Sequence, residues 1–464
     1  MRLLIFGLVL FVTIPELAFG GAPMDIGSRL ELFLDDYLIE EMNGVTLQLH
    51  EPVRRETVIT FDAPWEGDSS AYVTVFKDGQ RYRMYYRGSG NEGKSSNEVT
   101  CTAESVDGIH WTRPSVKIFD FNGSKDNNIV WIGKGAHAFS PFKDSNPSAR
   151  EEELYKAVGP GSGNGKSALY AFVSPDGYHW RALKKDPIIT DGTFDSHNVV
   201  FWDAERKEYV CYYRDFHAGI RDIKRAVSKD FSNWSKGEWL DWGDAPQEHL
   251  YTNAIIPYFR APHIYVGFPK RFVPGRKAIS THLEPGVSDG LFMSSRDGLH
   301  FHRWREAFLR PGPDPENWTD RNIMAAWGLL QLDPREISVY YSQHYRHPTN
   351  GLVRVTLRTD GFVSVHAGAS RGEMITKPLV FSGKELVINF STSAAGGIRV
   401  EIQDSNGSPV RGFSLEECSV IFGDEIERVV SWNGRTDVSG LAGKPVRLKF
   451  ELADADLYSI RFRE

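Results

Sequence analysis

Carboxylate, histidine and arginine side chains of this chain stand just before apolar runs, or at their ends, where different segments can converge. Asp68, Asp195 and Glu248 each lie a few residues ahead of such a run. Two carboxyl groups can together cleave a glycosidic bond, one as acid and one as base or nucleophile. Polar side chains nearby can bind sugar hydroxyl groups. The candidates for that binding role are Glu66, Arg87, His137, His197, Arg214, Asn253 and Arg321.

Each of these residues also has a structural interpretation. A carboxylate before a strand often caps a turn, and a buried histidine often satisfies a hydrogen bond. Arg87 and Arg214 end strand-like runs and could pair with carboxylates of the same sheet. The choice between the two interpretations depends on the elements that position these side chains.

Two repeated sequence units predict those elements. The first, Ser-x-Asp-Gly-x-x-Trp, occurs at 105–111 and 174–180, with degenerate copies at 228–234, 295–301 and 359–362. The second is a run of aromatic and β-branched residues that precedes each copy of the first. An Asp-Gly step suits a turn with positive φ, and the Trp can pack between neighbouring sheets. Repeats of this kind at spacings of 54 to 73 residues, without helical segments between them, are typical of β-propeller blades.

The repeats divide the chain into two domains. We expect five blades over 24–371, with the segment 31–39 supplying a strand that closes the last blade. From residue 372 onward the repeats stop, and short alternating strands predict an antiparallel β-sandwich over 372–464. The predicted fold class is therefore all-β, a five-bladed β-propeller followed by a C-terminal antiparallel β-sandwich. A single sandwich with chance turn repeats is the alternative.

Charge and cysteine content exclude several classes of partner and cofactor. The net charge is −7 and there is no basic block, so we expect no nucleic acid as partner. The three cysteines form no CxxC pair, which argues against a disulfide framework and a thiolate zinc site. The spacing of possible ligands predicts no catalytic metal and no other cofactor, while a structural calcium ion stays open. The oligomeric state cannot be predicted from the sequence.

The N-terminus predicts export. Arg2 precedes an apolar run too short to span a bilayer, and small residues follow at 18–20, the pattern of a secretory signal peptide. We therefore expect a signal peptide over 1–20, a secreted or periplasmic location, and no membrane span in the mature chain. An uncleaved anchor is the alternative interpretation.

In its layout the chain resembles the five-bladed β-propeller glycoside hydrolases of the family 32 and family 43 superfamily, and in particular secreted bacterial members with a C-terminal β-sandwich. The resemblance rests on Leu-Asp-Asp-Tyr-Leu-Ile-Glu at 34–40, Tyr-Arg-Met-Tyr-Tyr-Arg at 82–87 and the Asp-Gly units. It implies a glycoside hydrolase that cleaves an oligo- or polysaccharide, with a carbohydrate as partner. The sequence boxes of fructan-cleaving members are absent, so fructan specificity is not expected.

The resemblance also implies roles for three acidic residues on the first three blades. By position, Asp68 is the base or nucleophile and Asp195 or Glu248 is the general acid, whereas blade two has His137 where an aspartate is expected. Two other functions stay open. The missing aspartate favours a non-catalytic carbohydrate-binding propeller, and the Asp-Gly-Trp turns are similar to those of sialidases, although no arginine triad is evident.

Overall fold

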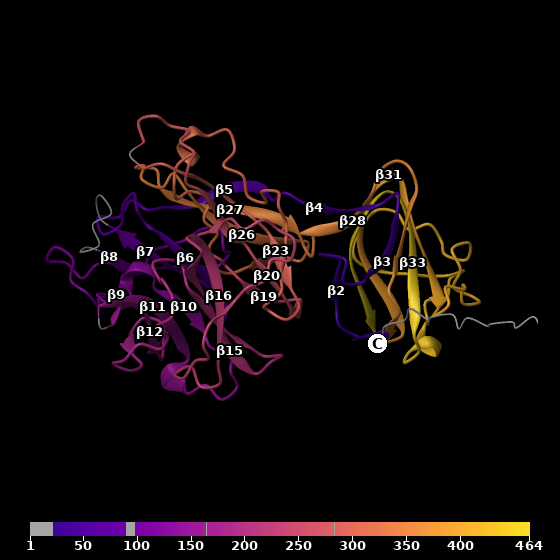
Figure 1. Ribbon diagram of the computed structural model, residues 1–464, viewed down its shortest axis with the longest axis horizontal. Helices are drawn as coiled ribbons and strands as arrows, with labels where there is room; N and C mark the ends of the chain where they lie inside the picture. The colour runs from indigo at the N-terminus through magenta and orange to yellow at the C-terminus, as the bar shows by residue number, and fades with distance from the viewer. Residues whose placement is uncertain (1–21, 90–97, 164, 283) are drawn as a thin grey trace, which may run out of the picture.

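The computed structural model describes residues 22–89, 98–163, 165–282 and 284–464, which form two lobes built almost entirely of strands (Figure 1). The signal peptide predicted at 1–20 lies outside the described residues. Within the described part, none of the helices is long and apolar enough to cross a membrane.

The larger lobe contains five four-stranded antiparallel sheets among the described residues, and these are the blades of the propeller. In blades one to four the strands follow chain order from the innermost outward. The inner strands of blades two and five both contact that of blade one, which closes the ring. The predicted all-β fold, a propeller followed by a sandwich, is confirmed. The blades, in order, are β6 (Ala71–Asp78), β7 (Arg81–Ser89), β8 (Glu98–Ser105), β9 (Ile129–Ile132); β10 (Ser140–Lys143), β11 (Tyr155–Gly163), β12 (Lys166–Ser174), β13 (Arg181–Ala182); β14 (Val199–Asp203), β15 (Glu208–His217), β16 (Ile220–Ser228), β17 (Glu238–Trp239); β19 (Ile256–Tyr258), β20 (Ala261–Gly267), β23 (Met293–Ser295), β24 (His302–Arg303); and β25 (Leu330–Asp333), β26 (Glu336–Gln343), β27 (Gly351–Arg358), β5 (Val53–Thr60).

The Asp-Gly turns join the blades to one another. Gly108 has a φ of 74°, which a glycine adopts without strain, and its carbonyl accepts a hydrogen bond from the Tyr340 hydroxyl of blade five at 2.7 Å. The Trp111 ring packs edge-on against the same tyrosine. Equivalent tyrosine-to-turn bonds run from Tyr85 to Gly177 and from Tyr212 to Gly298. The repeats therefore have a structural role, because they hold adjacent blades together and keep the funnel rigid.

The strand that closes the ring is β5, which pairs antiparallel with β27 on the outside of blade five. The prediction that 31–39 closes the last blade is wrong, since β2 (Glu31–Leu32) and β3 (Ile39–Asn43) pair within the sandwich instead. Apolar side chains of that segment are buried in the sandwich core and at its junction with the propeller. β5 is largely polar because an outermost strand packs on one face only, so its composition gives little strand signal.

The smaller lobe is a sandwich formed by one continuous ten-stranded sheet. Its members include strands from before the first blade, so residues 24–49 belong to this lobe, although the propeller was predicted to start at residue 24. The ring stack of Phe381 on Phe462, with centroids 3.6 Å apart, lies in its core. Its strands are β1 (Met24–Gly27), β2, β3, β4 (Thr46–Leu49), β28 (Val363–Ala367), β29 (Gly372–Thr376), β30 (Leu379–Phe381), β31 (Glu385–Asp404), β32 (Asp424–Val429) and β33 (Val446–Arg463).

A small three-stranded sheet adds to blade four. It consists of β18 (His249–Leu250), β21 (Lys270–Val273) and β22 (Val287–Gly290). Among the described residues this insertion has no counterpart in the other blades, and it brings a lysine and two aromatic rings to the funnel.

Candidate functional site

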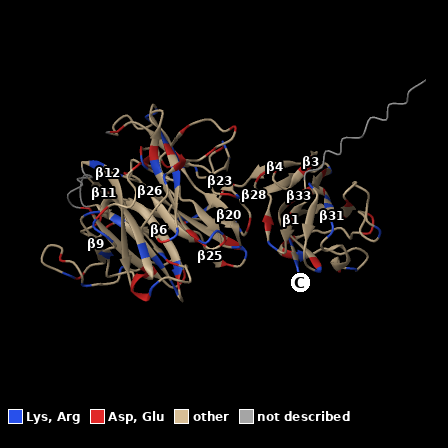
Figure 2. Ribbon diagram, turned by 60° about the horizontal axis from the view of Figure 1, so that its bottom comes forward, with Lys and Arg blue, Asp and Glu red and all other residues tan. Residues whose placement is uncertain are grey.

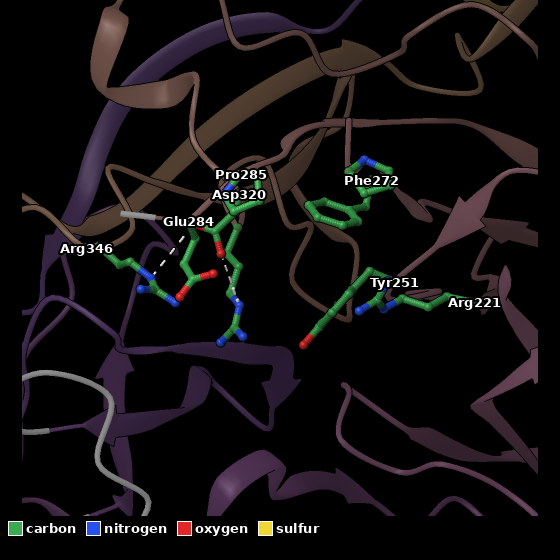
Figure 3. Close-up of a pocket in the computed structure, with 9 residues that line it drawn as sticks. Arg221, Tyr251, Phe272, Glu284, Pro285, Asp320 and Arg346 are labelled. Atoms are coloured by element: carbon green, nitrogen blue, oxygen red, sulfur yellow. Dashed lines mark ion pairs between the residues drawn. The ribbon is translucent and has the colours of Figure 1, made fainter. Parts of the chain in front are cut away.

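Two adjoining cavities, of about 350 and 750 Å³, share Glu284, Arg321 and Arg346 in their walls. Their other lining residues come from blade one, blade three, the blade-four insertion and the loops of blade five. In the smaller cavity Tyr251 and Arg221 lie opposite Asp320 and the shared residues (Figure 3). Side chains that are far apart in the sequence thus converge in one funnel, the kind of concave place in which ligand sites are commonly built.

His137 links three blades through two carboxylates. It lies in the short 3-10 helix η2 (Ala136–Ala138) ahead of the inner strand of blade two. Its Nδ1 is 2.8 Å from Glu98 Oε2 and its Nε2 is 2.7 Å from Asp195 Oδ1. Burial acts against the protonated imidazole, but the bonds to Asp195 and Glu98 outweigh it and raise the pKa of His137. The two carboxylates therefore favour the protonated form of His137.

Asp195 is held in its ionised form. The hydrogen bond from His137 is the main reason that the pKa of Asp195 lies well below its usual range, and the charges of His137 and Arg214 add to it despite burial. Arg214 Nη2 lies 4.0 Å from Asp195 Oδ2, while the carboxylate itself stays 59% exposed toward solvent. A carboxylate in this setting can act as base or nucleophile but is a poor proton donor. The geometry therefore favours the base role for Asp195 over the acid role expected from the sequence.

Asp68 has a different environment. Its side chain lines the larger cavity and accepts a hydrogen bond from Ser69 Oγ at 3.0 Å. Its backbone carbonyl accepts a bond from the Arg346 amide at 2.7 Å, which ties blade one to blade five. Across the described ranges, no cation forms an ion pair with the Asp68 carboxylate. The electrostatic environment of Asp68 therefore differs from that of Asp195, which lies next to His137 and Arg214.

Tyr345 lies between two arginines. Arg87 Nη2 and Arg321 Nη1 donate to its hydroxyl at 3.1 and 3.3 Å. Burial alone would raise the pKa of Tyr345, but the charges of Arg87 and Arg321 outweigh burial and lower it. Arg87 also donates to the Ser69 carbonyl at 2.6 Å, so this guanidinium positions both the tyrosine and the loop that carries Asp68.

The charged link at His137 predicts a pH-dependent stability. The raised pKa of His137 means that its ion pairs stabilise the fold fully below the pKa of an unfolded histidine, near 6.5, and that this contribution is lost as pH rises through the higher folded value. We expect the unfolding free energy of the wild type, relative to His137→Gln, to fall over this interval. Denaturant titrations of both proteins at a series of pH values measure this difference. A difference that stays constant with pH would contradict the ion pairs.

Three of the predicted binding residues are structural. Glu66 is buried and accepts hydrogen bonds from Arg113 at 2.8 Å and from Tyr86. His197 is fully buried, and burial lowers its pKa to about 3, so it is neutral. Asn253 is buried and donates to the Tyr212 carbonyl at 3.3 Å. These three side chains satisfy the interior of the blades and do not line either cavity.

Glu248 also lies outside the two cavities, although it was predicted as a general acid. Arg303 Nη1 donates to its Oε2 at 2.7 Å, and Arg271 Nη1 donates to its Oε1 at 3.3 Å. Both oxygens are thus occupied within the blade-four region. The residue directly precedes the inserted sheet rather than the inner strand of blade four.

Several funnel residues were not predicted. Tyr345 and Arg346 follow the second strand of blade five, close to the position that the predicted residue Arg87 has in blade one. That shared position is the signal that could have found them. Glu98 begins a third strand and Lys270 begins an inserted strand, and the sequence offers no signal for either. Among the described residues no group of three or more histidine, cysteine or acidic side chains is arranged to hold a metal ion.

No family model matches the chain. The uncharacterized protein Rv1502 of Mycobacterium tuberculosis is 31% identical over 156 residues, which are 33% of this chain and 44% of that protein. The chain therefore matches less than half the length of this relative, and a protein from a second strain of the same organism matches equally.

Solved structures of glycoside hydrolases are similar to this chain in layout. One glycoside hydrolase is 14% identical, with 66% of this chain and 92% of the other covered and a TM-score of 0.47. A family 43 arabinoxylan arabinofuranohydrolase from Bacillus subtilis is 13% identical, with coverage of 86% and 96% and a TM-score of 0.43. A fructofuranosidase from Schwanniomyces occidentalis is 11% identical, with coverage of 88% and 98% and a TM-score of 0.41. The propeller is defined by its own five sheets, and no activity follows from similarities at this level.

Proposed function

We propose that this protein is a glycoside hydrolase that cleaves an oligo- or polysaccharide in the propeller funnel. The observation that carries the proposal is the contrast between two carboxyl groups, Asp68 in the wall of the larger cavity and Asp195, whose pKa the charge of Arg321 in the same wall helps to lower. Asp195 is kept ionised by His137 and Arg214, whereas Asp68 has no cationic partner among the residues described. Acid and base roles in glycosidic cleavage require two carboxyl groups in different electrostatic environments.

In this mechanism Asp68 is the general acid and Asp195 is the base or nucleophile. Asp68 donates its proton to the glycosidic oxygen as the bond to the anomeric carbon breaks. Asp195 either takes a proton from the attacking water or attacks the anomeric carbon itself. His137 is a positioning residue, since it holds Asp195 in place through a 2.7 Å bond and is fixed in turn by Glu98. These roles reverse the assignment expected from the sequence.

The experiment that tests the proposal is a hydrolysis screen. The purified mature protein is incubated with a panel of plant and algal polysaccharides, and the release of reducing ends is measured. We expect release from at least one member of the panel. Binding of glycans without any release would instead support the non-catalytic carbohydrate-binding propeller. The export predicted from the first twenty residues would bring the enzyme to such substrates.

A second candidate mechanism uses Tyr345 as nucleophile, as in sialidases. The specific observation in its favour is the pair of arginines that contact the Tyr345 hydroxyl and stabilise its ionised form. The Tyr345→Phe variant separates the two mechanisms. With Asp195 as base or nucleophile, we expect kcat to fall about tenfold or less, because only a hydrogen bond is lost. A fall of about 10³-fold or more would assign the nucleophile to Tyr345.

A further inference from the structure

One wall of the smaller cavity carries more positive charge than its carboxylates balance. Arg221, Arg321 and Arg346 line it, and Lys270 lies directly beneath. Acidic and basic residues are otherwise interspersed over both lobes (Figure 2). The excess charge is thus a local feature of the funnel.

Two of these cations have no counterion. Lys270 is 1% exposed, and its Nζ has one long hydrogen bond, 3.5 Å to the Asp320 carbonyl, together with the Tyr251 ring at 4.4 Å. Arg221 has a buried Nε without a partner, and its guanidinium lies 5.5 Å from the Tyr251 ring. Within the described part of the chain, neither Lys270 nor Arg221 forms an ion pair.

The Asp320 carboxylate beside these cations already has three other partners. Asp320 accepts a bond from His282 at 3.0 Å and lies 3.4 and 3.7 Å from Arg321 and Arg346. The other carboxylate of this wall, Glu284, is exposed, and no ion pair of it occurs among the described residues. Burial, with the charges of neighbouring arginines, lowers the pKa of Lys270 to about 7, and a bound anion would stabilise its ammonium form.

We propose that Arg221, Lys270 and Arg321 form a subsite for an anionic group of the substrate, either a uronate carboxylate or a sulfate ester. This inference rests on the proposed function and specifies its substrate class as an acidic glycan. Guanidinium and ammonium groups donate charge-assisted hydrogen bonds to such oxygens. Tyr251 and Phe272 line the same cavity and supply apolar surface for a sugar ring. A neutral glycan would supply no counterion to the buried Lys270 or to the partly buried Arg221.

The test is calorimetric binding of four probes to the wild type: methyl glucuronide, its neutral methyl ester, methyl glucoside 6-sulfate and inorganic sulfate. We expect at least one of the two acidic sugars to bind tenfold or more tightly than the neutral ester, and more tightly than inorganic sulfate. Preference for the glucuronide identifies a uronate, and preference for the sulfated sugar identifies a sulfate ester. Equal affinity for acidic and neutral sugars, or failure of both acidic sugars to bind, would overturn the subsite.

Variants locate the subsite. Arg221→Gln and Lys270→Met are each expected to weaken acidic-sugar binding about 10- to 100-fold and to leave binding of the neutral ester unchanged. Lys277→Met removes an exposed charge from the same insertion and is expected to bind as the wild type does. Circular dichroism checks that each variant folds. Arg221 is only partly buried, so the Arg221→Gln variant still tests the subsite if Lys270→Met does not fold. Unchanged affinity in Arg221→Gln would contradict the assignment.

Selective binding of acidic sugars without cleavage of any glycan would contradict the proposed hydrolase function but would still support the anionic subsite.

Discussion

Replacing Asp195 with Asn is expected to lower kcat by about 10³-fold or more, because the amide can neither accept a proton nor attack the anomeric carbon. The side chain is more than half exposed, so its loss of charge has little effect on the packed interior. We therefore expect a melting temperature within a few degrees of the wild type. Steady-state kinetics on a substrate from the screen, together with thermal unfolding, measure both quantities.

Asp186→Asn is the matched control for this variant. Asp186 is an exposed aspartate outside the funnel, and its replacement is expected to leave both kcat and melting temperature unchanged. An Asp195→Asn enzyme that keeps kcat within tenfold of the wild type would show that this carboxylate is neither base nor nucleophile.

The Asp68→Asn variant is expected to lose about 10²- to 10⁴-fold in kcat on a natural glycan, the usual range for removal of a general acid. The loss should be much smaller on an aryl glycoside, because a phenolate leaving group departs without protonation. The alkaline limb of the pH-rate profile should also disappear, since that limb reports deprotonation of the acid. Comparing the two substrates at several pH values measures both effects.

Glu248→Gln distinguishes this assignment from the one expected from the sequence. We expect this variant to keep kcat, because Glu248 does not line the funnel cavities. Its free energy of unfolding should fall by about 1 to 3 kcal/mol, because Arg303, which is 4% exposed as a whole residue, loses a charged partner. Equal losses of kcat in Asp68→Asn on both substrates, or a large loss in Glu248→Gln, would contradict Asp68 as the acid.

The blades could be predicted because their signals are local and repeated. An Asp-Gly step followed by Trp specifies a turn and the packing of one ring, and each copy does so independently of the others. The closing strand could not be predicted in the same way. β5 is mostly polar, since its outer face contacts solvent, while the apolar segment 31–39 is strand-like but is buried with the sandwich.

The candidate site was predictable where a residue immediately approaches or ends a blade strand. Asp68, Asp195 and His137 come from three blades, where Asp68 lines the larger cavity and Asp195 bonds to His137. Glu66 lies only two residues before Asp68, yet it turns inward to Arg113, and no composition signal separates the two. Lys270 could not be predicted because it lies in an insertion that has no counterpart among the repeats.

The measurement that tests the central claim most directly is reducing-end release by the wild type, the two single variants and the double variant Asp68→Asn/Asp195→Asn on the same glycan. If both carboxylates act in one reaction, the double variant should lose about as much activity as the more damaged single variant, because residues that act as a unit are not additive. Release by the double variant at the wild-type rate would show that the funnel carboxylates do not cleave the bond.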